Sequence, residues 1–219
     1  MPRDADCCDM TRLILVRHAQ SESNKAKFYA AQTNVNLTEL GRAQAEETAR
    51  FLRDYPIDVA YSSDYVRVIQ TAKPIVRDRG LSLIPTVGLR EINGGVWEGL
   101  PYSEIEARYP VERAIWHKDI VNCICPGGDS VRDVFIRASR TLDEILAQSN
   151  GKNILIASHA TVIRVLLTRF RGIPFEGLKD IPWPDNASVT VVDYDNHGKF
   201  HIVLEGYNEH LKKAGLAPA

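Results

Sequence analysis

The chain has 219 residues, of which 44% are hydrophobic and 25% are charged. These values are typical of a globular protein with one large or two small domains, and they exclude a fibrous or wholly disordered chain. The 27 lysines and arginines nearly balance the 28 aspartates and glutamates, so no overall field draws the chain to nucleic acid or to an anionic membrane. We therefore expect a single domain over residues 1–219 that has neither of these partners.

The sequence also shows no sign of a membrane span, a secretory signal or a zinc site. The sequence has no run of 18 apolar residues, and residues 1–10 lack the apolar core of a secretory signal. We also expect residues 1–10 to be flexible. The four cysteines, Cys7, Cys8, Cys123 and Cys125, lack the spacing of a zinc site. We interpret them as reduced thiols of a cytoplasmic protein and expect no metal and no cofactor.

The first half of the chain alternates between strand and helix patterns. Short apolar runs predict strands at residues 12–16, 58–62 and 81–84. Between them, Thr38 is expected to cap a helix that ends near residue 53, and Asp64 to cap a second helix that ends near residue 76. From residue 87 to 129, frequent glycines and prolines break the pattern, and we expect residues 101–128 to form an inserted cap.

The second half returns to the alternation. Ser130 and Asp133 predict a capping box that opens a helix to about residue 148. The expected elements that follow are a central strand at residues 153–158, a helix to about residue 170, a hairpin of residues 188–193 and 199–204, and a tail at residues 208–219. This order predicts an α/β protein, a three-layer sandwich with a mostly parallel central sheet flanked by helices.

Four residues whose side chains could bind or attack a phosphate group lie at or near the ends of predicted strands, where functional sites form in such sheets. Arg17 and His18 follow the first strand, Arg67 follows the second, and His159 follows the central strand. Arginine forks match the paired oxygens of a phosphate group, and a neutral imidazole is a nucleophile toward phosphorus. Their joint placement favours a phosphate site over four unrelated structural residues.

Six segments around these residues resemble motifs of the histidine phosphatase superfamily, which includes phosphoglycerate mutases. In chain order they are LVRHAQSESN (15–24), LTELGRAQA (37–45), YSSDYVRVIQTA (61–72), LREINGGVWEG (89–99), PGGDS (126–130) and SHATVIR (158–164). The resemblance covers about 70% of the chain in the family's order, and it implies the family's α/β fold and phosphohistidine chemistry.

The resemblance also implies roles for individual residues. His18 becomes the phosphohistidine, and Glu91 is the proton donor to the leaving group. The phosphoryl group is bound by a set that the motifs place around His18, namely Arg17, Asn24, Arg67, His159 and Ala160. Glu22 and Glu98 are rival acids, of which Glu98 is expected to be structural.

Two alanines depart from the family pattern, which usually has glycine after each of the two histidines. Ala19 and Ala160 stand at these positions. If either backbone requires a positive φ, alanine costs roughly 1 kcal/mol or more there; otherwise its methyl group only narrows the pocket.

We therefore expect a histidine acid phosphatase-type phosphomonoester hydrolase that acts on a small phosphorylated metabolite as a monomer or homodimer. A cofactor-dependent phosphoglycerate mutase is the first alternative, and a non-catalytic phosphate-binding module is the second. The expected cap favours the phosphatase because Tyr102, Trp116 and Ile124 make it partly apolar. A mutase must bind a second phosphate and needs more cations than this segment provides.

Overall fold

The computed structural model describes residues 10–217 and contains one six-stranded sheet. The strand order is β3-β2-β4-β1-β5-β6. The bounds are Thr11–Arg17 for β1, Val59–Ser62 for β2, Leu83–Pro85 for β3, Asn153–Ser158 for β4, Val189–Tyr194 for β5 and Phe200–Tyr207 for β6. The first four strands in the sheet order are mutually parallel, whereas β5 and β6 run antiparallel at one edge.

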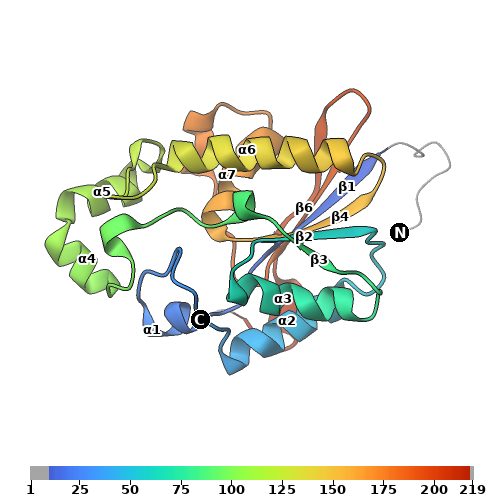
Figure 1. The fold of residues 1–219 in the computed structure, drawn as a ribbon, viewed down its shortest axis with the longest axis horizontal. Coiled ribbons are helices and arrows are strands. Elements are labelled where there is room, and N and C mark those ends of the chain that lie inside the picture. The colour runs from blue at the N-terminus through green and yellow to red at the C-terminus, as the bar shows by residue number, and fades with distance from the viewer. Residues whose placement is uncertain (1–9, 218–219) are drawn as a thin grey trace.

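Helices cover both faces of this sheet (Figure 1). One face packs against α6 (Val131–Gln148) and α7 (Ala160–Phe170), and the other against α2 (Glu39–Phe51) and α3 (Val66–Arg77). Successive side chains of a strand point to opposite faces. In β1, Leu13 and Leu15 accordingly pack with the α6–α7 layer, and Ile14 and Val16 with the other layer. The prediction of a three-layer α/β sandwich is confirmed.

Local hydrogen bonds explain where the long helices begin. The side chain of Thr38 accepts a bond from the backbone N–H of Gly41 at 2.9 Å and caps α2, as predicted. Ser130 and Asp133 form the predicted capping box at the start of α6. These short polar side chains satisfy backbone N–H groups that the first helical turn leaves without partners.

The prediction that Asp64 caps a helix is wrong. The N-cap of α3 is Tyr65, and no side chain caps this helix. Asp64 instead forms an ion pair with Arg90, accepting from its Nε at 2.8 Å, and this pair holds the pKa of Asp64 below its usual range. A partner 26 residues away along the chain has therefore displaced the local capping bond.

Residues 101–128 form a separate layer of short helices at one end of the sheet, on the left in Figure 1. They contain α4 (Tyr102–Arg108), α5 (Pro110–Lys118) and a 3-10 turn, η3 (Ile120–Asn122). Cys123 and Cys125 follow as free, buried cysteines. Two further 3-10 turns, η1 (Val87–Leu89) and η2 (Gly95–Trp97), lead into this layer from β3.

Three short elements lie outside the predicted pattern. They are α1 (Glu22–Ala26), the 3-10 helix η4 (Phe175–Asp180) and α8 (Glu209–Lys213). The segment expected to be a tail thus contains a helix, and Leu211 of that helix is fully buried. Residues 1–9, with Cys7 and Cys8, lie outside the described residues. Within residues 10–217, no helix is both long and apolar enough to cross a membrane.

Candidate active site

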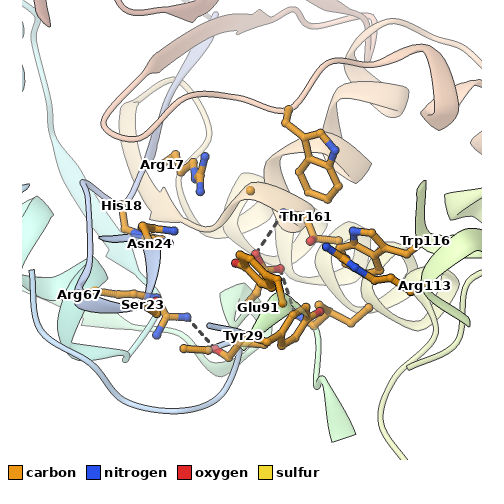
Figure 2. Close-up of a pocket in the computed structure, with 16 residues that line it drawn as sticks. Arg17, His18, Ser23, Asn24, Tyr29, Arg67, Glu91, Arg113, Trp116 and Thr161 are labelled. Carbon is orange, nitrogen blue, oxygen red and sulfur yellow. Dashed lines mark hydrogen bonds between the residues drawn. The ribbon is translucent and has the colours of Figure 1, made fainter. Parts of the chain in front are cut away.

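The carboxyl ends of β1 and β4 open into a pocket of about 290 Å³. Six of the seven residues predicted for the site line it, namely Arg17, His18, Asn24, Arg67, Glu91 and Ala160. Figure 2 shows Arg17, His18 and Arg67 on one side, Arg113 and Trp116 on the opposite side, and Glu91 between them. The pocket thus brings together groups that lie up to 166 positions apart in the sequence, from Arg17 to Trp183.

His18 is fixed in the orientation that a nucleophile needs. Its backbone N–H donates to the carbonyl oxygen of Ser158 at 2.9 Å, and its Nδ1 lies 2.8 Å from the carbonyl oxygen of Ala19. A carbonyl oxygen only accepts, so Nδ1 carries the proton and Nε2 keeps its lone pair. Burial, with help from Arg67 and Arg17, holds the pKa of His18 well below its ordinary value. The imidazole is therefore neutral at neutral pH.

Arg17 presents unused donors beside this ring. Its Nη1 donates to the carbonyl oxygen of Pro184 at 2.6 Å, whereas its buried Nε has no hydrogen-bond partner among the described residues. Burial lowers the pKa of Arg17, but an arginine remains a cation in proteins. An unpaired buried donor is costly, so the geometry suits an anionic ligand that Arg17 would bind.

Arg67 is 99% buried and is held by backbone carbonyl groups. Its Nη2 donates to the carbonyl oxygen of Ala31 at 2.7 Å, and its Nη1 donates to that of Thr33 at 3.1 Å. These bonds fix the plane of the guanidinium group at the pocket wall.

His159 stands behind the pocket instead of lining it. Nη2 of Arg67 lies 3.2 Å from Nδ1 of His159, and because arginine only donates, Nδ1 is the acceptor. The proton of the His159 ring is therefore on Nε2, which donates to Oγ of Ser63 at 2.9 Å. Its ring meets that of His18 edge-on, with centroids 5.3 Å apart. Burial and the neighbouring Arg67 hold its pKa well below the ordinary value. In this structure His159 thus contacts Arg67 and His18, which were predicted to share its site.

A second capping box orients Asn24. Its Oδ1 accepts from the backbone N–H of Ser21 at 3.0 Å, from Oγ of Ser21 at 2.8 Å and from Nδ2 of Asn186 at 3.2 Å. The same Asn186 also donates to the carbonyl oxygen of His18 at 2.9 Å. With Oδ1 occupied, the amide NH2 of Asn24 is the group left for a ligand in the pocket.

Glu91 is the glutamate that reaches the pocket. Its Oε1 accepts from the backbone N–H of Ile92 at 2.9 Å, and its Oε2 from that of Thr161 at 3.3 Å. Glu22 is exposed and does not line the pocket. Glu98 does not line it either, because its carboxylate accepts backbone N–H groups of the loop 31–33, such as that of Gln32 at 2.9 Å. Of the three acids considered, the geometry favours Glu91 for chemistry.

The wall opposite His18 is aromatic and carries one cation. Trp116 stacks on Trp183 with ring centroids 5.7 Å apart, and Arg113 lies over the ring of Tyr102 at 5.4 Å. The buried Nε of Arg113 makes no hydrogen bond among the described residues, and its ionic contact with Oε1 of Glu106 is long, at 3.9 Å. Ile124, the third apolar residue noted in the cap sequence, is 62% exposed and does not line this pocket.

Sequence reasoning missed several residues of the site, namely Ser23, Tyr29, Thr161, Trp183 and Asn186. A topological signal for the last two existed. Strand β5 pairs antiparallel with β1, with Val189 opposite Val16, so the segment before β5 must lie beside His18. That segment contains Trp183 and Asn186.

The alanines at the two glycine positions fit their backbones. Among the described non-glycine residues, only Lys27 and Ala187 have a positive φ. Neither Ala19 nor Ala160 therefore adopts the left-handed backbone conformation that would strain an alanine. Ala19 is completely buried in a small apolar cluster with Leu37 and others, and Ala160 lines the pocket.

Comparisons with known proteins agree with the resemblance of the sequence motifs. A family model described as "Histidine phosphatase superfamily (branch 1)" matches residues 13–208. "Phosphoserine phosphatase 1" of Hydrogenobacter thermophilus is 30% identical over 183 residues, which cover 84% of this chain and 86% of that protein. "Probable phosphoglycerate mutase GpmB" of Yersinia pestis is 33% identical over 189 residues, with the same two coverages. The solved structure of Bacillus stearothermophilus YhfR superposes with a TM-score of 0.87 at 28% identity, covering 92% of this chain and 99% of that chain.

Proposed function

The chain belongs to the histidine phosphatase superfamily, branch 1, and from this premise we propose that it hydrolyses a small organic phosphomonoester through a phosphohistidine on His18. The superfamily makes it a phosphatase or a mutase. The observation that carries the proposal is the free Nε2 of a neutral His18 beside the unpaired donors of Arg17 and the fixed guanidinium of Arg67.

In the first step, Nε2 of His18 attacks phosphorus, the N–P bond forms and the ester P–O bond breaks. The leaving oxygen takes a proton from the carboxyl group of Glu91. Arg17, Arg67 and the amide of Asn24 bind the phosphoryl oxygens, over which a loose transition state spreads its charge. His159 supports this set by accepting a bond from Arg67.

In the second step, water attacks phosphorus and gives its proton to the carboxylate of Glu91. The N–P bond breaks, phosphate leaves and His18 returns to its neutral form. Glu91 thus acts as acid and then as base, as microscopic reversibility requires. This cycle needs no group beyond the side chains of the pocket.

The cap favours hydrolysis over mutase activity. Of its four basic side chains in α4 and α5, only Arg113 lines the pocket. Arg108 pairs with Glu104, and His117 and Lys118 line a different cavity. A mutase must hold a bisphosphate intermediate, and its second phosphate would be desolvated with little charge compensation. A non-catalytic binding module is disfavoured because the nucleophile and the proton donor are both present and oriented.

The side chains opposite His18 also indicate which organic group the substrate carries. Tyr102, Trp116 and Trp183 provide apolar contact area. Within the described residues, Nε of Arg113 makes no hydrogen bond and has only a long ionic contact of 3.9 Å to Oε1 of Glu106, so it can donate to an acceptor oxygen of the substrate. We propose a phosphorylated metabolite with an apolar or neutral body and one such oxygen. The relative named phosphoserine phosphatase supports a small phosphorylated metabolite as the substrate class.

The deciding experiment follows 3-phosphoglycerate, primed with 2,3-bisphosphoglycerate, by phosphorus NMR, alongside a panel of phosphorylated metabolites assayed for free phosphate. The proposal expects phosphate release from panel members and slow or absent formation of 2-phosphoglycerate. Conversion to 2-phosphoglycerate that outpaces phosphate release would establish the mutase alternative.

Three finer assignments belong to this proposal. They are the histidine acid phosphatase-type classification, a cytoplasmic location and a monomeric or homodimeric state. Cell fractionation tests the second, and light scattering of the purified protein tests the third.

A further inference from the structure

Glu98 and Arg67 both bind the loop of residues 31–33. Oε2 of Glu98 accepts from the backbone N–H groups of Ala31 at 3.2 Å and Thr33 at 3.1 Å, and from the Thr33 hydroxyl at 2.8 Å. Oε1 accepts from the backbone N–H of Gln32 at 2.9 Å. Arg67 donates to the carbonyl oxygens of Ala31 and Thr33, at 2.7 and 3.1 Å. The carboxylate therefore binds the donors of these residues, and the guanidinium binds their acceptors.

This loop has no regular structure that would hold it otherwise. Residues 31–33 belong to no helix or strand, and among the described residues only Glu98 accepts from their three backbone N–H groups. A carboxylate that accepts several backbone N–H groups binds strongly because the bonds are charge-assisted. Without it, three N–H groups would have to turn toward water, and the carbonyl oxygens of the same residues would turn with them.

The loop in turn determines where Arg67 lies. The guanidinium uses Nη1 and Nη2 on the two loop carbonyl oxygens and shares Nη2 with His159. Ala31 itself lines the pocket, so a shift of the loop moves both the pocket wall and the plane of Arg67. Burial lowers the pKa of Arg67, and Glu98, after Glu91 and Tyr65, is one of the groups that oppose this effect.

We propose that Glu98 is a positioning residue for phosphoryl transfer, because its carboxylate holds the loop 31–33 whose carbonyl oxygens set the guanidinium of Arg67. This role goes beyond the purely structural one expected from the sequence. It rests on the proposed function, in which Arg67 binds the phosphoryl oxygens.

The primary variant is Glu98→Gln. Glutamine keeps one acceptor oxygen and places an NH2 group against backbone N–H donors, so the loop loses part of its anchor while the side-chain size is preserved. Removal of one preorganised donor to a developing oxyanion costs about 100- to 1,000-fold in kcat. A displaced Arg67 would stabilise the transition state less well without ceasing to act. We therefore expect Glu98→Gln to lower kcat/KM on p-nitrophenyl phosphate by about 10-fold and to weaken vanadate inhibition by a similar factor.

A double-mutant cycle separates positioning from general structural damage. In an Arg67→Met background, Glu98→Gln is expected to change kcat/KM by less than about 2-fold, because the residue through which Glu98 acts is gone. If Glu98→Gln causes the same fold loss with and without Arg67, Glu98 does not act through Arg67 and the proposal is overturned. Arg67→Lys provides a second background, and Glu98→Asp a second variant, if either first choice fails to fold.

Asp195→Asn is the matched control. Asp195 also accepts two backbone N–H groups of a loop, those of His197 and Lys199, but in the β5–β6 hairpin and outside the pocket. Its kcat/KM and vanadate inhibition are expected to match the wild type. Wild-type phosphatase activity is measured in parallel: its absence would refute the proposed function, whereas its presence with no effect of Glu98→Gln would refute only the positioning role.

Discussion

Oε2 of Glu91 accepts a hydrogen bond from the backbone N–H of Thr161 at 3.3 Å, which ties the candidate proton donor to the first turn of α7. The bond joins two segments 70 residues apart, and the residue before α7 is His159. The candidate acid and His159 are therefore both held at the start of α7.

Glu91→Gln is expected to reduce kcat on alkyl phosphates by about 100-fold or more, within the usual contribution of general acid catalysis. The loss on p-nitrophenyl phosphate is expected to be much smaller, because its leaving group needs little protonation. Steady-state kinetics on both substrates measures the difference. Glu22→Gln, a change at the exposed rival acid, serves as the control and should leave both rates unchanged. Equal losses on the two substrates for Glu91→Gln would point to another acid.

Activity is expected to survive treatment with EDTA. The positive charge that a metal ion would supply comes in this account from Arg17 and Arg67, which flank His18. Vanadate should inhibit, since its trigonal-bipyramidal form resembles the transition state. The measurement is the initial rate after dialysis against chelator, with and without added Mg²⁺. A rate that falls on chelation and returns with Mg²⁺ would contradict the prediction.

Ala19→Gly, which restores the residue usual in the family, is expected to destabilise the fold. Ala19 is fully buried and is not among the described residues with positive φ, so glycine gains nothing there. The lost methyl contact and the added freedom of the unfolded chain amount to about 1–2 kcal/mol. Urea unfolding gives this free energy directly, while kcat should change little. A stability equal to or above that of the wild type would show that alanine is strained at this position.

The pH dependence of stability is expected to reflect the buried histidines. His18 and His159 have folded-state pKa values well below the ordinary value of 6.5. As the pH falls below about 6.5, the unfolded chain binds protons that the folded chain does not, so stability decreases, by up to about 1.4 kcal/mol per pH unit for each such histidine. The stability is fully present above that pH.

His159→Gln is the variant that tests this slope. Urea unfolding at several pH values between 5 and 7 is expected to give a shallower decrease than in the wild type, whatever the absolute loss of stability. Burial is the largest cause of the low pKa of His159, and the charges of Arg67, His18, Arg17 and Arg137 lower it further. An unchanged slope would mean that His159 titrates alike in both states.

The sequence was sufficient to predict the sheet and the residues attached to it. A buried strand fixes where its next residue lies, so Arg17, His18 and His159 could be placed from the apolar runs before them. The prediction for Asp64 failed because local capping competed with Arg90, whose position depends on the tertiary fold. Pairing with a residue that distant in the sequence leaves no local signal.

The sequence indicated that residues 101–128 form an inserted segment, but it did not indicate in which direction each side chain of that segment points. Residues 101–128 contain no strand whose register would fix the direction of each residue, so the sequence could not show that Arg113 faces the pocket and Ile124 faces solvent. Glu91 was found only through its motif, because it lies between two 3-10 turns. The hydrogen bonds of Glu98 to residues 31–33 join two loops, and loops have no periodic sequence pattern from which such contacts could be predicted.

The central claim is covalent catalysis by His18, and trapping of the intermediate tests it most directly. Enzyme mixed with ³²P-labelled substrate and quenched within milliseconds is expected to carry an acid-labile, base-stable phosphoryl group, which peptide mapping under alkaline conditions places on His18. His18→Ala should neither trap the label nor turn over substrate at a measurable rate. Turnover near the wild-type rate in His18→Ala, or label on another residue, would contradict the account.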